Sequence, residues 1–269
     1  MADPRALAAE IAAAHANKQP IAPPTTREAE FDLVTAYATE AELVRMRKDA
    51  GRCTVGVKVG FANRAMWRAL KLDTLVWAHM YDDTVRYAEN DHASVSIGKM
   101  YAPKIEPEIV FKLRTEVPPD ADASSALAAV EWIALGFEII DCVYPDWKIT
   151  PPDFVASFGL HAGLIVGTPQ RITPDQIPAL AEHLASFTVS LQKNSAVVAQ
   201  GAGKNSLKSP ALCLAELSSA TTKAGGTLAG GSVISSGTLT EAQFIAVEET
   251  YTAVVEGIPL PPLTVRIEG

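Results

Sequence analysis

Apolar positions near the start of the chain repeat with helical spacing. An apolar stripe at every fourth residue predicts a helix over residues 3–17. A proline-rich turn follows, and Thr25 and Glu28 then have the spacing of a capping box. This pattern predicts a second helix from that point to about Lys48.

Beyond Gly51 the pattern changes to the alternation of apolar and polar residues that is typical of strands. The expected strands cover residues 53–60, 104–113, 136–144 and 163–167, a hairpin of 186–192 with 196–200, and strand-like segments at 226–237 and 262–268. The expected helices among them cover residues 63–71 and 124–135 and begin at Thr173 and Ser209. This order predicts an α+β fold, with a helical N-terminal region over residues 1–52 and a β-rich catalytic domain over residues 53–269.

Composition excludes several classes of protein. The chain has 269 residues, of which 48% are hydrophobic, so it can bury a large core and is not intrinsically disordered. Its net charge of −8 disfavours nucleic acid as a partner. Three widely spaced cysteines predict reduced thiols in a cytoplasmic protein. The sequence has no apolar run long enough to span a membrane and no signal-peptide pattern, so we expect no membrane association.

A pair of glutamates in the strand predicted over residues 104–113 is the first candidate for chemistry. Side chains two residues apart on a strand point to the same face, so Glu106 and Glu108 project together. Two adjacent like charges are costly unless a cation neutralises them, and a hard divalent cation does so well. The alternative is an exposed edge strand with two ordinary surface carboxylates.

A third glutamate lies inside an apolar run. Glu138 stands between Phe137 and Ile139, where a buried carboxylate is costly unless it is paired or binds a metal. Asp141 has the opposite strand parity, so we expect one of the two carboxylates to face inward. An inward Glu138 would complete a set of three oxygen ligands that suits Mg²⁺ or Mn²⁺ and leaves positions for water and substrate. The alternative is an outward-facing Glu138 on a half-exposed strand.

Lys58 is the third candidate. In the strand over residues 53–60 it shares a face with Gly56 and Gly60, which leaves room for a ligand to approach closely. The alternative is a lysine at a strand edge whose charged end reaches solvent. His161 is a lone histidine in an apolar run, a pattern that is more typical of a structural residue than of an acid–base catalyst.

The segments that contain these residues resemble one enzyme family when they are taken in order. GVKVG, PKIEPEI and FEIID…DWKI, followed by the glycine-rich C-terminal segments, resemble the 2-oxopent-4-enoate hydratase and 4-oxalocrotonate decarboxylase group of the fumarylacetoacetate hydrolase superfamily. The resemblance covers roughly residues 30–268. It implies a mixed β-roll fold, a divalent metal, usually Mg²⁺, a homo-oligomer, and a complex between hydratase and decarboxylase.

The resemblance also implies roles for individual residues. Glu106, Glu108 and Glu138 would be the metal ligands, and Lys58 would be the active-site lysine. The candidate substrate contacts are Thr238, Lys148, Val76 and His161.

Two departures from the family pattern bear on the substrate. Val76 stands where the hydratases carry an acidic residue and the decarboxylases an apolar one, which favours decarboxylation. Phe158, Leu160 and His161 fall in a run that is polar in the family, which predicts a more apolar substrate pocket.

A 2-oxo acid offers its carboxylate and ketone oxygens to one metal ion, which stabilises an enolate. We therefore expect a metal-dependent lyase, a hydratase or a decarboxylase, that acts on a 2-oxo or 2-hydroxydienoic acid in the catabolism of aromatic or related compounds. Two alternatives stay open: an acylpyruvate-type C–C hydrolase of the same superfamily, and a weakly active metal-binding partner subunit.

Overall fold

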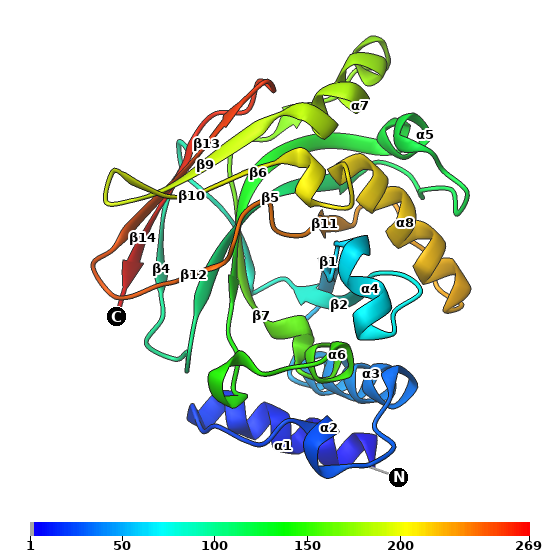
Figure 1. Ribbon diagram of the computed structural model, residues 1–269, viewed down its shortest axis with the longest axis vertical. Coiled ribbons are helices and arrows are strands. Elements are labelled where there is room, and N and C mark those ends of the chain that lie inside the picture. The colour runs from blue at the N-terminus through cyan, green and yellow to red at the C-terminus, as the bar shows by residue number, and fades with distance from the viewer. Residues whose placement is uncertain (1–2) are drawn as a thin grey trace.

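Three helices form the N-terminal region of the computed structural model, which describes residues 3–269 (Figure 1). Helix α1 covers Pro4–Asn17, close to the helix predicted over residues 3–17. Helix α2 covers Pro24–Arg27 and helix α3 covers Leu33–Asp49, so the second predicted helix is split in two. Apolar side chains of α1 and α3 belong to the same hydrophobic core as those of the strands, which fixes the helices against the sheet.

The predicted capping box of Thr25 and Glu28 is wrong because Thr25 binds elsewhere. Its N–H and its hydroxyl donate to the buried carboxylate of Asp153, at 2.9 and 2.7 Å. The long helix begins after Asp32, whose carboxylate accepts a first-turn backbone N–H, that of Thr35, at 2.9 Å. A tertiary hydrogen bond has therefore replaced the local one.

A mixed sheet of nine strands curls around the core, in the order β2-β1-β11-β5-β6-β7-β3, with β12 also paired to β5 and β8 to β6. These strands are β1 Thr54–Gly60, β2 Val76–Tyr81, β3 Val85–Tyr87, β5 Lys104–Leu113, β6 Val130–Ile140, β7 His161–Val166, β8 Gln170–Arg171, β11 Val233–Ser235 and β12 Gln243–Phe244. A second sheet of five strands has the order β10-β9-β13-β14-β4. Its strands are β4 His92–Ser96, β9 Thr188–Lys193, β10 Ala196–Ala202, β13 Thr250–Glu256 and β14 Leu263–Glu268.

The remaining helices lie around the sheets, with α5, α7 and α8 at the end opposite the N-terminal helices (Figure 1). They are α4 Arg64–Leu70, α5 Ala123–Ala128, α6 Pro151–Ala156, α7 Ile177–Ser186 and α8 Pro210–Lys223, with 3₁₀ turns at Pro145–Trp147, Phe158–Leu160, Pro174–Gln176 and Gly203–Asn205. None of these helices in residues 3–269 combines the length and hydropathy needed to span a bilayer. The predicted α+β class is confirmed.

The helix predicted over residues 124–135 is wrong in its second half. Helix α5 ends at Ala128, and residues 130–140 form strand β6 in the centre of the large sheet. A strand that is buried on both faces has an almost continuous apolar sequence, which periodicity cannot distinguish from a buried helix. Strands β2, β3, β4, β8, β12 and β13 also lay outside the sequence prediction.

A gap in the large sheet opposite the middle of β5 positions the candidate site. The pairing of β5 with β11 ends at Val110, and the pairing of β5 with β12 ends at Ile105. Between these points the loop after β11 takes the place of a strand. This arrangement suits Pro107, because proline has no backbone N–H to donate to a neighbouring strand. The N–H of Leu239 in that loop donates to the Pro107 carbonyl at 2.9 Å.

Candidate metal centre and substrate cavity

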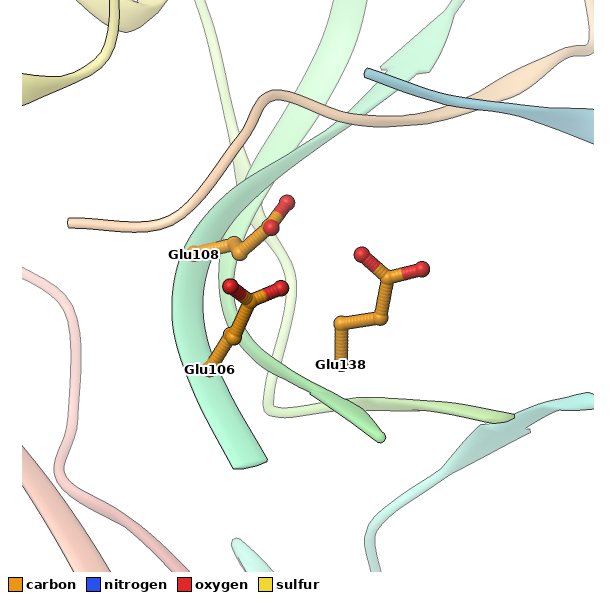
Figure 2. A group of neighbouring side chains, drawn as sticks. All are labelled: Glu106, Glu108 and Glu138. Carbon is orange, nitrogen blue, oxygen red and sulfur yellow. The ribbon is translucent and has the colours of Figure 1, made fainter. Parts of the chain in front are cut away.

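Three glutamates on adjacent strands bring their carboxylates together. Glu106 and Glu108 are two residues apart on β5 and share a face, as predicted. Glu138 on β6 is the direct cross-strand partner of Glu106. Carboxylate oxygens of the three residues lie within 4.8 Å of one another (Figure 2). The sheet register therefore assembles an acidic cluster from two strands.

Burial and mutual repulsion shift the pKa of these carboxyl groups. Burial raises the pKa of Glu106 to about 7, and the charge of Glu138 adds to the shift while Lys58 opposes it. Burial, together with repulsion from the other two carboxylates, also holds the pKa of Glu108 well above its ordinary value. At Glu138 burial acts in the same direction, but the charge of Lys58 and a hydrogen bond from His161 lower the pKa overall.

Glu108 is held by the loop after β11. The Ser235 hydroxyl and the Gly237 N–H donate to its Oε2, at 2.5 and 2.8 Å. Gly237 has a φ of +93°, which only glycine adopts without strain. The other oxygen, Oε1, is buried and has no hydrogen-bond partner within residues 3–269. An unpaired buried carboxylate oxygen is costly, so this donor set fits a hard divalent cation.

Lys58 reaches the cluster from β1. Its Nζ lies 3.0 Å from Glu138 Oε2, donates to the Gly159 carbonyl at 2.9 Å and stands 4.7 Å from the centre of the Phe154 ring. Burial acts to lower the pKa of Lys58, but the charges of the three glutamates raise it overall. The lysine is therefore a buried cation, held by one ion pair and one hydrogen bond.

A strained turn supplies the carbonyl that holds Lys58. Residues 158–160 all have positive φ, of 55°, 58° and 60°, which costs roughly 1–2 kcal/mol for each residue other than glycine. A Cβ on Gly159 would lie 2.7 Å from the Ala78 Cβ, so no larger residue fits there without a shift. Just before this turn, Ser157 Oγ lies 2.8 Å from His15 Nε2 on helix α1, which anchors the turn to the N-terminal region.

A cavity of about 560 Å³ opens beside Lys58 and Glu106. Thr238 lies on its wall, and the Thr238 hydroxyl donates to the Thr240 carbonyl at 2.9 Å. Met66 also lines the cavity and is 48% exposed, so it lies on the open side. A small ligand in this space would contact the lysine and the acidic cluster at the same time.

Two of the other predicted substrate contacts lie away from the cavity wall. Val76 is buried on β2, where it pairs with Gly60 of β1 and packs in the hydrophobic core. The Lys148 side chain is 81% exposed and its Nζ lies 3.4 Å from Asp146 Oδ2. Among the predicted contacts, Thr238 alone stands on the wall.

His161 lies behind Glu138 and not on the cavity wall. Its Nδ1 is 2.9 Å from Glu138 Oε1, and its Nε2 is 2.9 Å from the Thr84 hydroxyl oxygen. Because a carboxylate only accepts hydrogen bonds, Nδ1 is the donor in the first contact. The ring therefore fixes the orientation of Glu138 from the side opposite Lys58.

Strand parity predicted that one of Glu138 and Asp141 faces inward, and both are buried. Strand β6 ends at Ile140, so strand parity does not apply to Asp141. The Asp141 carboxylate accepts the backbone N–H groups of Tyr101 and Ala102 instead, at 3.1 and 2.8 Å.

Sequence reasoning missed several residues that support the site. Ser235 was not singled out, although it begins a small polar run, Ser235-Ser236-Gly237, directly after apolar residues. Thr84 and Gly159 had no signal at all, because their roles depend on contacts between segments far apart in the chain.

The chain is similar in sequence to known hydratases and decarboxylases. No protein-family model matches the chain. The chain is 27% identical over 239 residues to 2-hydroxyhexa-2,4-dienoate hydratase of Comamonas testosteroni, which covers 88% of each protein. It is 26% identical over 254 residues to a 4-oxalocrotonate decarboxylase of Pseudomonas putida, which covers 94% of this chain and 93% of the relative.

The solved structure of a decarboxylase is also similar to this chain. The 4-oxalocrotonate decarboxylase from Pseudomonas putida G7, complexed with magnesium and adipate, matches with a TM-score of 0.88 and 25% identity, over 98% of this chain and 97% of that one. The chain is a relative of the hydratase–decarboxylase group. The resemblance predicted from the sequence is thereby confirmed. A fumarylpyruvate hydrolase from Pseudomonas aeruginosa, in complex with Mn²⁺ and pyruvate, shares the fold at 16% identity and a TM-score of 0.59, over 79% of this chain and 88% of that one. The hydratase–decarboxylase relative and this hydrolase together confirm the predicted fold of the fumarylacetoacetate hydrolase type.

Proposed function

We propose that the protein is a divalent-metal-dependent lyase, a hydratase or decarboxylase that acts on a 2-oxo or 2-hydroxydienoic acid in the catabolism of aromatic or related compounds. The observation that carries the proposal is the cluster of three carboxylates, with oxygens within 4.8 Å of one another, beside a cavity lined by a buried lysine. Similarity to hydratases and decarboxylases over most of the chain supports it. The catabolic role and a location in the cytoplasm, which suits the three free cysteines, belong to the same proposal.

Glu106, Glu108 and Glu138 would hold Mg²⁺ or Mn²⁺, because carboxylate oxygens are the donors that these ions prefer. When bound, the cation supplies a Lewis acid for the carboxylate and keto oxygens of a 2-oxo acid. Lys58 donates an N–H to the substrate carboxylate and stays protonated. Thr238 contacts the substrate from the cavity wall.

Two reactions fit this arrangement. In decarboxylation of a six-carbon 2-oxo-3-enedioic acid, the C5–C6 bond breaks, CO₂ leaves, and the electron pair moves through the conjugated chain to the keto oxygen. In hydration of a 2-hydroxy-2,4-dienoic acid, the 2-hydroxyl loses a proton and C5 gains one, which gives a 2-oxo-3-enoic acid. Water then adds across C3 and C4, with its oxygen bonding to C4 and a proton bonding to C3. Both need charge stabilisation at the 2-oxo end, where the metal ligands and Lys58 lie.

Ultraviolet spectra test the proposal directly. The purified chain is mixed with 2-hydroxypenta-2,4-dienoate and with 4-oxalocrotonate, each with Mg²⁺ and with EDTA. We expect Mg²⁺-dependent loss of one chromophore and expect Glu106→Gln to abolish it. Glu131→Gln is the matched control, since Glu131 lies on β6, the strand that carries Glu138, but pairs with Arg171.

Three outcomes of this assay would contradict the proposal. Full activity of Glu106→Gln in EDTA would show that the ligand assignment is wrong. Cleavage of an acylpyruvate in place of both dienoic substrates would support the hydrolase alternative. Absence of turnover with metal bound would support the partner-subunit alternative.

A homo-oligomer, or a complex with a partner enzyme, stays a prediction. Light scattering tests it by measuring the molar mass of the particles in solution.

A further inference from the structure

The turn over residues 157–160 sets the position of Lys58. The Gly159 carbonyl accepts the Lys58 N–H at 2.9 Å, and the next residue, Leu160, lines the cavity. A shift of this turn would therefore move the ammonium group and one part of the cavity wall together. The positive φ angles of residues 158–160 are costly, and such backbone persists only where its surroundings fix it.

Backbone hydrogen bonds hold the two ends of the turn. The Leu160 N–H donates to the Ser157 carbonyl at 2.7 Å, and the Leu160 carbonyl accepts the Asp141 N–H at 2.9 Å. These bonds leave the side chains of Ser157 and Phe158 to other contacts.

His15 on helix α1 contacts both of these side chains. Its Nε2 shares a hydrogen bond of 2.8 Å with the buried hydroxyl of Ser157. Its ring stands nearly perpendicular to the Phe158 ring, at 76° and with 5.8 Å between the ring centres. The other ring nitrogen, Nδ1, faces Asp141 Oδ2 at 3.8 Å. One side chain therefore reaches the turn at two successive residues.

Helix α1 gives His15 a fixed base. Leu7 and Ile11 of this helix are buried in the hydrophobic core. Just after the helix, the Lys18 ammonium group donates to the Gly98 carbonyl at 2.9 Å. The His15 side chain is itself 21% exposed, so its replacement opens no closed cavity in the core. The ring thus connects an independently anchored helix to the strained turn.

We propose that His15 is a positioning residue of the site, which fixes the turn over residues 157–160 through Ser157 and Phe158 and thereby directs the Lys58 ammonium group toward the cavity. This inference rests on the proposed function, in which Lys58 binds the substrate carboxylate. It makes the N-terminal helical region part of the site, although none of residues 4–17 lines the cavity.

Two substitutions of His15 distinguish its two ring nitrogens. The amide of Gln reaches the position of Nε2, which contacts Ser157, and the shorter amide of Asn reaches that of Nδ1, which faces Asp141. The ligand is 2-oxopentanoate, a 2-oxo acid that has no double bond to hydrate and no second carboxylate to lose. Its binding is measured by titration calorimetry with saturating Mg²⁺ and with EDTA. We expect His15→Asn to weaken Mg²⁺-dependent binding by about threefold to tenfold, the effect of one lost hydrogen bond, and His15→Gln to stay within about twofold of wild type.

Two further measurements test whether the effect passes through Ser157 to Lys58. Ser157→Ala should weaken binding of 2-oxopentanoate as much as His15→Asn does, and the double variant should weaken it no further. The affinity for Mg²⁺ alone should stay within about twofold of wild type in these variants, because His161 still orients Glu138. A general loosening of the protein would weaken the binding of the metal and of the ligand alike.

The outcomes separate this inference from the proposed function. Equal binding by wild type and His15→Asn, equal losses in His15→Asn and His15→Gln, or additive effects of His15→Asn and Ser157→Ala would overturn the positioning role and leave the proposed function in place. A loss of Mg²⁺ affinity as large as the loss of 2-oxopentanoate affinity would do the same. Failure of wild type to bind 2-oxopentanoate, or binding that ignores Mg²⁺, would overturn the proposed function and this inference with it.

Discussion

Substitution of Lys58 by Met removes a buried cation that faces the three glutamates. At 3.0 Å and an effective dielectric constant of about 20, the attraction between Lys58 Nζ and Glu138 Oε2 is about 5.5 kcal/mol. Loss of one partner of a buried pair destabilises proteins by about 3–5 kcal/mol, because the other charge stays buried and unpaired. The Gly159 carbonyl also loses its donor. We expect the free energy of unfolding of the metal-free variant to fall by about 3–5 kcal/mol.

Urea unfolding followed by circular dichroism at pH 8 measures this change. Wild type, Lys58→Met, Glu138→Gln and the double variant are compared in EDTA and in Mg²⁺. The double variant should lose at least about 2 kcal/mol less than the sum of the single variants, and Mg²⁺ should reduce the loss in Lys58→Met. Lys148→Met, at an 81% exposed side chain, is the control and should change stability by less than about 0.5 kcal/mol. A loss below about 1 kcal/mol in Lys58→Met, or additive single effects, would refute the buried pair.

Three further predictions follow from the site. The pKa of Glu106 is about 7 in the metal-free protein, against an ordinary value of 4.5. The contribution of the raised Glu106 pKa to the free energy of unfolding is therefore fully present below about pH 4.5 and is lost as the pH rises through about 7. Mg²⁺ competes with the same proton for Glu106, so the dissociation constant of Mg²⁺, measured by calorimetry, should rise as the pH falls below about 7. The Glu106→Gln variant should show a flatter dependence of this constant on pH, and a flat profile in wild type would contradict the prediction. His161→Ala should weaken Mg²⁺ binding by about tenfold because Glu138 loses its orienting donor, with partial recovery in His161→Asn; equal affinity in wild type and His161→Ala would show that the ring does not orient the ligand. Gly159→Ala should lower the free energy of unfolding by about 1–3 kcal/mol, as measured in urea, because the residue combines a φ of +58° with a close approach to Ala78; a change near zero would mean that the turn relaxes freely.

The same-face placement of Glu106 and Glu108 followed from sequence because it depends on one strand alone. Strand periodicity places side chains two residues apart on one face wherever that strand lies in the sheet. The position of Glu138 opposite Glu106 depends on the register between β5 and β6, which no local pattern determines. The inward position of Glu138 was therefore an inference from the cost of a buried charge.

Contacts between distant segments account for most of what the sequence did not predict. The Gly159 carbonyl reaches Lys58 across 101 positions of the chain, and Thr84 reaches His161 across 77. Local patterns also failed where a tertiary partner was stronger, as when Thr25 bound Asp153 in place of its own helix. The helix–strand error after Ala128 arose because a central strand and a buried helix have similar apolar sequences.

Anomalous scattering from a crystal grown with Mn²⁺ locates the bound cation directly. The proposed lyase site predicts one strong peak per chain between the carboxylates of Glu106, Glu108 and Glu138, and its loss in Glu108→Gln. A peak at another position, or three carboxylates that stay uncoordinated at saturating Mn²⁺, would contradict the metal centre on which the proposed chemistry depends.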